Sequence, residues 1–126
     1  RLQEIEDLFG SRVAAIVDGC TDAYKLPKPP WRERKEKYLQ ELISASRSVI
    51  LVSLADKVHN ARSIYRDLRR EGEAVWDRFT GGKEGTLWYY RSLGDIFRSH
   101  RDEYPALVHE FLSTVEAIER LAHERE

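Results

Sequence analysis

Apolar residues recur three or four positions apart along most of this chain, which is the spacing of amphipathic α-helices. Pro27, Pro29 and Pro30 exclude a helix from residues 21–30, because proline lacks the backbone donor and clashes with the preceding turn. No segment alternates in the manner of a half-buried strand. The pattern therefore predicts an all-α fold, with helices over residues 2–9, 11–17, 31–44, 49–72, 84–100 and 102–124, and a short helical turn over 73–79.

The helix over 49–72 has the most distinctive pattern. It opens with the run 49–52, VILV, which is apolar on every side and predicts a buried segment. Its second half is amphipathic and ends near Gly72, since glycine favours a helix stop. The positions expected to face inward are Leu54, Val58, Ala61, Tyr65 and Leu68 in this helix, and Tyr38, Leu39, Leu42 and Ile43 in the preceding one.

A narrow polar stripe runs along the same helix, opposite its apolar face. At about 100° per residue, Asp56, Asn60, Ser63 and Asp67 fall on one line. Such a stripe is usually solvated surface. A carboxylate followed one turn later by an amide can also form part of a metal or phosphate site, so the spacing alone leaves both interpretations open.

Composition narrows the class of protein. With 126 residues, 41% of them hydrophobic and 34% charged, the chain is long enough for one folded core but not for two domains. Its net charge of −1 argues against a general nucleic-acid or membrane-surface binder. The longest apolar run falls far short of the ~20 residues that span a bilayer. The lone Cys20 excludes an internal disulfide and suits a reducing cytoplasm.

The stretch 54–62, LADKVHNAR, resembles the last metal-binding motif of HD-domain phosphohydrolases, in the branch of the Rel/SpoT stringent-response enzymes and their small stand-alone relatives. Residues 9–22, FGSRVAAIVDGCTD, are similar to another stretch of that family. Two further pieces agree in order and spacing: residues 25–35 resemble the linker and helix start that precede the Asp56 helix, and residues 83–90, KEGTLWYY, resemble a helix that lines the nucleotide pocket. The resemblance implies an HD-domain helical bundle.

Other elements of that family are missing from the chain. HD domains are named for an earlier His and a His-Asp pair that bind one divalent cation together with the later Asp. These elements lie upstream of the stretch that begins here at Phe9, and residues 1–8 do not supply them. A divalent ion needs several donors. We therefore expect residues 1–126 to form one HD domain that is incomplete at its N-terminus and inactive by itself, with the catalytic residues upstream.

The resemblance assigns roles residue by residue. Asp56 is expected to bind the metal, and Asn60 and Ser63 to contact the nucleotide. Lys28, Arg32 and Lys83 lie near positions where relatives present cations to the phosphates, although the run Pro29–Trp31 puts the register of the first two in doubt. For each of these three, a solvated surface charge is the more common explanation in a chain with 21 basic residues.

The expected function is that of a metal-dependent phosphohydrolase, with Mn²⁺ as its cofactor by analogy with the family. Its expected partner is a nucleotide such as (p)ppGpp, from which it removes the 3′-pyrophosphate. Two alternatives stay open: an HD phosphohydrolase that acts on another nucleotide or a phosphomonoester, and an inactive HD module that binds a nucleotide or a protein. We expect no nucleic-acid or membrane partner and a cytoplasmic location, and assembly into a homo-oligomer stays open.

Overall fold

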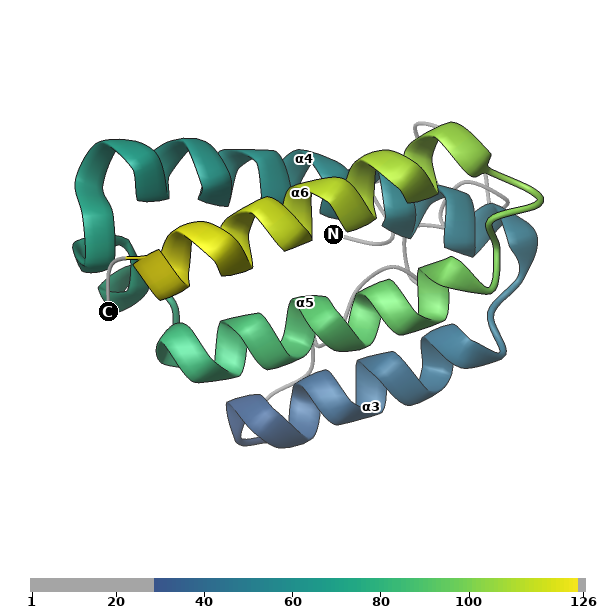
Figure 1. The fold of residues 1–126 in the computed structure, drawn as a ribbon. Coiled ribbons are helices and arrows are strands. Elements are labelled where there is room, and N and C mark those ends of the chain that lie inside the picture. Colours follow the sequence, from purple (N-terminus) through teal and green to yellow (C-terminus); the bar gives the residue numbers. More distant parts are fainter. Residues whose placement is uncertain (1–28, 125–126) are drawn as a thin grey trace, which may run out of the picture. The chain divides into compact units, whose positions relative to one another are not determined.

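The computed structural model describes residues 29–124, and these residues form helices without any strand. The elements are α3 (Trp31–Ile43), α4 (Arg47–Glu71), the 3-10 helix η1 (Gly72–Arg78), α5 (Gly82–Arg98) and α6 (Pro105–Glu124) (Figure 1). This confirms the all-α prediction. The helices predicted over 2–9 and 11–17 lie outside the described residues. The described residues divide into two compact units, unit 1 up to Ser53 and unit 2 from Leu54 onwards, and the boundary falls within α4.

The helix ends follow from local chemistry. Gly72 adopts a φ of 72°, a left-handed conformation that ends α4 and that glycine adopts without a steric penalty. The predicted stop at Gly72 and the predicted turn over 73–79 are therefore confirmed. α6 begins at Pro105 rather than at residue 102, because proline suits a first helical turn, where its missing N–H is not needed. Before it, the Nδ1 atom of His100 lies 2.7 Å from Oε1 of Glu103.

Unit 1 buries one side of each of its two helical segments. Tyr38, Leu39 and Leu42 are buried as predicted. The hydroxyl groups of Tyr38 and Ser53 are 2.5 Å apart and buried, which joins α3 to the first half of α4.

Three predictions of buried side chains in unit 1 are wrong. Ile43 is 60% exposed, and Leu51 and Val52 are each 39% exposed. In both helices the inward positions are already occupied, by Leu42 in α3 and by Ile50 in α4. The residue after each points about 100° away, and Val52, two residues after Ile50, points about 200° away. An apolar residue in a run is therefore not necessarily an inward one.

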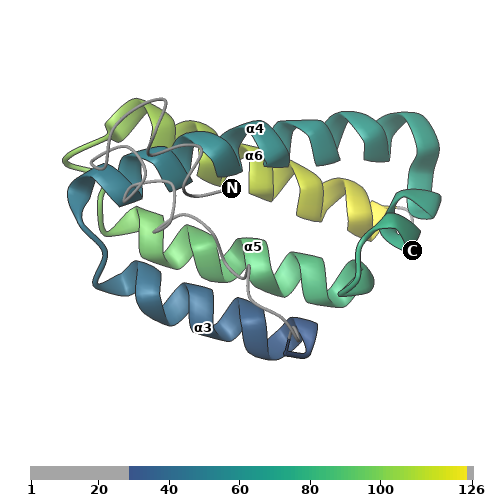
Figure 2. The ribbon, with the colours of Figure 1, turned by 180° about the vertical axis from the view of Figure 1, so that it is seen from behind.

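Unit 2 packs the second half of α4 with η1, α5 and α6. α5 runs antiparallel to α6 and to the second half of α4 (Figures 1 and 2). At the centre, the ring of Phe111 in α6 packs edge to face against Phe97, with centroids 5.1 Å apart, and stacks on Tyr90 at 6.0 Å. α4 contributes Leu54, Val58, Ala61, Ile64 and Leu68 to this core. Ile64 thus occupies the inward position predicted for Tyr65, which is half-buried.

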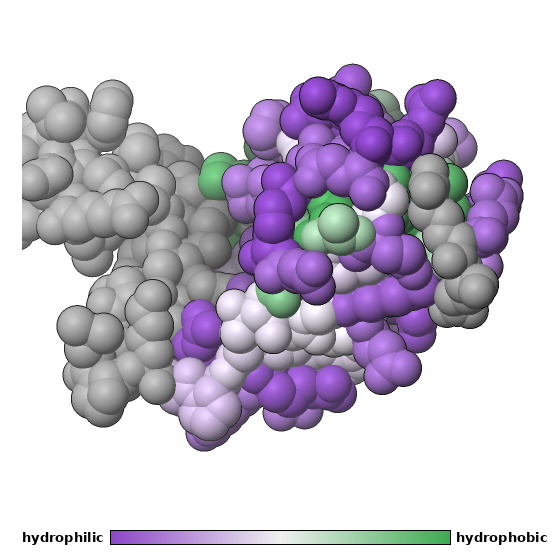
Figure 3. Space-filling model, turned by 90° about the vertical axis from the view of Figure 1, so that its left-hand side faces the viewer, coloured by the Kyte–Doolittle hydropathy of each residue, from purple (hydrophilic) through white to green (hydrophobic). Residues whose placement is uncertain are grey.

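The surface of unit 2 is largely polar. An ion pair of 3.1 Å joins Arg62 of α4 to Glu110 of α6, and Arg91 of α5 donates to Glu119 of α6. From the end of the unit where α4 stops and α5 begins, most side chains are hydrophilic and apolar ones show only in small patches (Figure 3). None of the helices within residues 29–124 has the length and apolar character needed to cross a membrane.

Candidate functional site

A cavity of about 330 Å³ lies in unit 2, where α4, η1 and α5 meet. Its size is at the lower end of the range for small-molecule sites, roughly 300–1,000 Å³. The lining combines two aromatic rings and one aliphatic side chain with four polar or charged groups. The lining residues are Asn60, Ser63, Ile64 and Asp67 from α4, Arg78 and Phe79 at the end of η1, and Tyr90 from α5.

The polar stripe of α4 forms one wall of this cavity. Asn60, Ser63 and Asp67 are spaced three and four residues apart, so their side chains lie on the same side of the helix. All three are half-buried rather than fully exposed, whereas Asp56, at the start of the stripe, is exposed. The stripe is therefore more than a solvated face, because three of its four members line this open cavity.

Asp67 and Arg78 form the charged part of the lining. A terminal nitrogen of Arg78 donates to Oδ2 of Asp67 at 3.0 Å and also lies 3.7 Å from Glu71. The hydrogen bond from Arg78 is the main reason why the pKa of Asp67 is held below its usual range, and Arg66 contributes in the same direction. Asp67, whose side chain is 19% exposed, is thus an ionised carboxylate that can only accept hydrogen bonds.

Tyr90 closes the wall formed by α5. Its ring is fixed by stacking on Phe111 and by an edge-to-face contact with Tyr89, at a centroid distance of 5.7 Å. Burial, and secondly the negative charge of Asp56, raise the pKa of Tyr90 well above its usual value. The phenol therefore stays protonated to a higher pH than an ordinary tyrosine does and retains its O–H donor.

Asp56 lies one turn before the cavity and contacts it through Asn60. The amide nitrogen of Asn60 donates to Oδ2 of Asp56 at 3.4 Å, and the Nζ atom of Lys57 lies 3.7 Å from the same oxygen. The Asp56 side chain is 58% exposed, so its carboxylate is accessible to a ligand. Among residues 29–124, however, no three His, Cys, Asp or Glu side chains are grouped to hold a metal ion. These residues alone therefore do not make a divalent-cation site, and Asp56 is suited to be one ligand among several.

The predicted basic residues do not join the cavity lining. The Nζ atom of Lys83 donates to Oε1 of Glu73 at 2.8 Å and to the carbonyl oxygen of Ala122 at 3.2 Å, which ties η1 and the start of α5 to the last turn of α6. Arg32 belongs to unit 1, where it lies 3.6 Å from Glu36, one turn further along α3. Lys28 lies outside the described residues.

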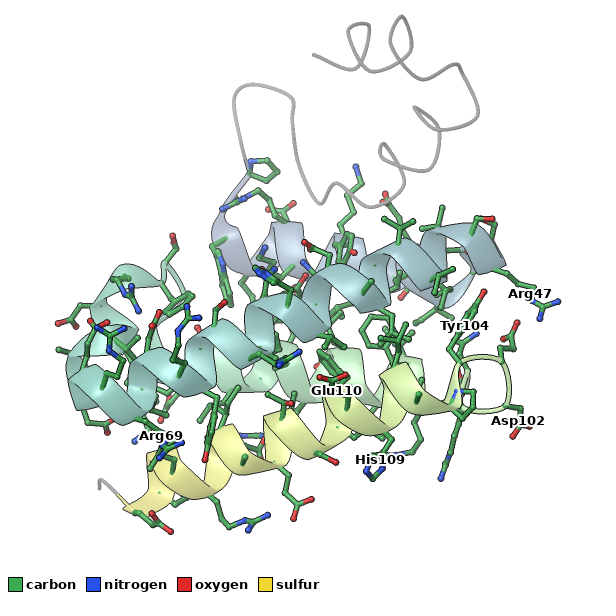
Figure 4. All side chains as sticks on the ribbon, turned by 90° about the horizontal axis from the view of Figure 1, so that it is seen from above. Arg47, Arg69, Asp102, Tyr104, His109 and Glu110 are labelled. Atoms are coloured by element: carbon green, nitrogen blue, oxygen red, sulfur yellow. The ribbon has the colours of Figure 1, made fainter. Side chains whose placement is uncertain are left out.

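The sequence pattern predicted the cavity wall that α4 forms, but it did not predict most of the remaining lining. Tyr90 is the last residue of the stretch that resembles a pocket-lining helix, so that stretch was a usable signal for it. Arg78 and Phe79 carried no signal, since neither belongs to a motif. His109 points away from α4, whereas Glu110 lies on the side of α6 that faces it (Figure 4). The ring of His109 is therefore not directed at the cavity wall that α4 forms.

Comparison with known proteins agrees with the resemblance noted in the sequence. The chain matches the HD domain family over residues 1–87. It is 41% identical over 64 residues to the guanosine-3′,5′-bis(diphosphate) 3′-pyrophosphohydrolase MESH1 of Danio rerio, which covers 51% of this chain and 34% of that protein.

Two further relatives carry related names. The MESH1 protein of Mus musculus is 38% identical over 65 residues, covering 52% of this chain and 35% of that protein. The bifunctional (p)ppGpp synthase/hydrolase SpoT of Escherichia coli is 38% identical over 69 residues, covering 49% of this chain and 9% of that protein. In each case the match spans about a third or less of the relative's length.

Proposed function

Since the chain belongs to the HD domain family, we propose that it forms the nucleoside-binding part of a phosphohydrolase that removes the 3′-pyrophosphate from (p)ppGpp. The names of the relatives support this substrate. The observation that carries the proposal is the cavity in unit 2. Asn60 and Ser63, the two residues expected to contact the nucleotide, line it together, and Asp56 lies next to Asn60.

The cavity suits a base and a sugar. The Asn60 amide can both donate and accept, and the Ser63 hydroxyl can do the same, which matches the hydroxyl groups of a ribose. Phe79 and Ile64 supply apolar surface for a flat base. Its volume of about 330 Å³ leaves little room for a nucleotide with all its phosphates, so the phosphates would extend outside.

We further propose that Asp56 is one ligand of a divalent cation, Mn²⁺ by analogy with the family. The remaining ligands would come from residues outside the range 29–124, because that range offers no cluster of three candidate ligands. Lys28 and Arg32 stay candidates for the phosphates, whereas the two bonds made by Lys83 favour a structural role for it. We also propose that residues 1–126 form a single HD domain and that the protein acts in the stringent response. A cytoplasmic location completes the proposal, and the lone Cys20 suits it.

The decisive experiment is Mn²⁺-dependent release of pyrophosphate from ppGpp by the whole protein, with wild type compared with Asp56→Asn. Loss of even an outer partner of a metal ligand typically costs 10- to 100-fold, so we expect the variant to lose roughly 100-fold or more. Asp95→Asn is the matched control, because Asp95 is 77% exposed on α5 and does not line the cavity. Substantial activity in Asp56→Asn would refute the ligand role of Asp56.

A second candidate function is a nucleotide-binding HD module without catalysis. The cavity favours it, because Asn60 and Ser63 line that cavity and could bind a nucleotide without a metal ion. Nucleotide binding without turnover of ppGpp, other nucleotides or phosphomonoesters would support this module over the hydrolase. Turnover of another substrate would instead keep the HD phosphohydrolase and change only what it acts on.

A further inference from the structure

We infer that Asp67 selects the base of the bound nucleotide, by accepting hydrogen bonds from the N1–H and the 2-amino group of guanine. This inference rests on the proposed function, because it concerns the same cavity. It goes further by assigning base selection to a residue that lies outside the resemblance motif 54–62.

The position of Asp67 suits a group that reads a ligand. Its side chain lines the cavity at the last position of the polar stripe, two turns beyond Asn60, and is 19% exposed. Arg78 and Arg66 hold it in the ionised form. A charged acceptor in a partly enclosed site forms stronger hydrogen bonds than a neutral one, so this carboxylate can discriminate between ligands.

The carboxylate still has acceptor capacity. Its two oxygens offer about four acceptor positions. Arg78 occupies one on Oδ2 at 3.0 Å, and Arg66 reaches Oδ1 only at 3.5 Å, the outer limit for a hydrogen bond. Two parallel N–H donors from a base can therefore be accommodated while the ion pair with Arg78 persists.

The chemistry of the bases makes such a group selective. Guanine presents two adjacent donors, N1–H and the 2-amino group, and a carboxylate accepts both. Adenine presents an unprotonated N1, whose lone pair would face the negative charge of Asp67. An acceptor-only group at this position therefore favours guanine and disfavours adenine.

The competing explanation is that Asp67 only anchors Arg78. The substitution Asp67→Asn separates the two roles, because an amide oxygen can still accept from Arg78. Its amide nitrogen, however, is a donor that opposes the 2-amino group of guanine and matches the 2-carbonyl oxygen of xanthine. Base reading thus predicts a change of preference from guanine to xanthine, which an anchoring role does not.

The test is calorimetric titration of the whole protein, with Mn²⁺ present, using guanosine, xanthosine and adenosine 5′-diphosphates (GDP, XDP and ADP). Wild type should prefer GDP over ADP by roughly 10- to 100-fold, the range for a good bidentate contact to a base. Asp67→Asn should lose a similar factor for GDP and bind XDP more tightly than GDP. Asp95→Asn should keep the wild-type order.

The outcomes separate this inference from the proposed function. Wild type that binds none of the nucleotides refutes both. Wild type that binds GDP and ADP equally, or a variant that weakens GDP and XDP by the same factor, refutes only the base-reading role of Asp67. If Asp67→Asn fails to fold, the wild-type protein is titrated with inosine 5′-diphosphate, whose base lacks the 2-amino group. The wild-type protein should bind inosine 5′-diphosphate at least several-fold more weakly than GDP, and equal affinities would overturn the inference.

Discussion

Truncation of Phe111 to alanine should destabilise unit 2 and weaken nucleotide binding together. The side chain is fully buried in α6, between Phe97 at a centroid distance of 5.1 Å and Tyr90 at 6.0 Å. Phe→Ala substitutions in cores cost about 3–5 kcal/mol, because apolar contact is lost and a cavity remains. A domain is stable by only about 5–15 kcal/mol in total, so this loss is a large fraction of the free energy of unfolding.

Nucleotide binding should weaken because Phe111 supports a wall of the cavity. Tyr90 stacks on Phe111, and without that ring its own position in the cavity lining is less restricted. Phe111→Leu leaves a smaller void and should fall between wild type and Phe111→Ala in both stability and affinity. Ile43→Ala is the control for removal of a large apolar side chain, since Ile43 is 60% exposed and should change stability by no more than about 0.5 kcal/mol.

Urea unfolding followed by far-ultraviolet circular dichroism gives the free energy of unfolding from the midpoint and the slope. GDP titrations on the same samples, under conditions where each variant is folded, give the affinity. A loss below about 1 kcal/mol in Phe111→Ala would contradict the packing described here. A large loss of stability with unchanged GDP affinity would contradict the link between Phe111 and the cavity wall.

Three further predictions concern single residues. Gly72→Ala should lower the free energy of unfolding by about 1 kcal/mol, measured by urea unfolding, because alanine is strained at a φ of 72°. The pKa of Tyr90 is raised in the folded protein, whereas a tyrosine in the unfolded chain loses its proton at a pKa of about 10. The free energy of unfolding should therefore fall as the pH rises above about 10. Thermal melts should show a smaller fall for Tyr90→Phe, which has no phenol to titrate. Lys83→Met should lower the melting temperature, because Glu73 loses one of its partners, the Lys83 ammonium group 2.8 Å away. The variant should leave GDP affinity unchanged, and a loss of affinity in calorimetry would return Lys83 to the phosphate site.

The helices of this protein could be predicted from sequence because their causes are local. Apolar spacing located all the helices of the described range, and Gly72 marked the end of α4. The burial of individual side chains could be predicted less well than the positions of the helices. Leu51 and Val52 lie in an apolar run, yet which side of a helix is covered depends on what packs against it, and the run itself carries no information about that.

The residues of the candidate site also differ in how well the sequence predicts them. Asn60, Ser63 and Asp67 share one helix, so their common side could be deduced from spacing alone. Arg78 is eleven residues from its partner Asp67, and the two meet only because the chain turns at Gly72 and continues as η1. A contact made across such a turn depends on backbone geometry, which a pattern of residue types does not specify.

The order of side chains along α4 gives the proposed site a direction. From Asp56 to Asp67 the helix rises about 16 Å, at roughly 1.5 Å per residue, which is comparable with the extended length of a nucleotide. At one end, the carboxylates of Asp67 and Glu71 balance the positive charges of Arg66 and Arg78. That end therefore offers no excess cation to a pyrophosphate and suits an uncharged base. Asn60 and Ser63 lie between, where a ribose would follow the base. At the other end the exposed carboxylate of Asp56 would repel phosphates unless a cation lay between them. The proposed metal ligand and the proposed base-reading residue therefore occupy opposite ends of one stripe, in the order that base, sugar and phosphate require.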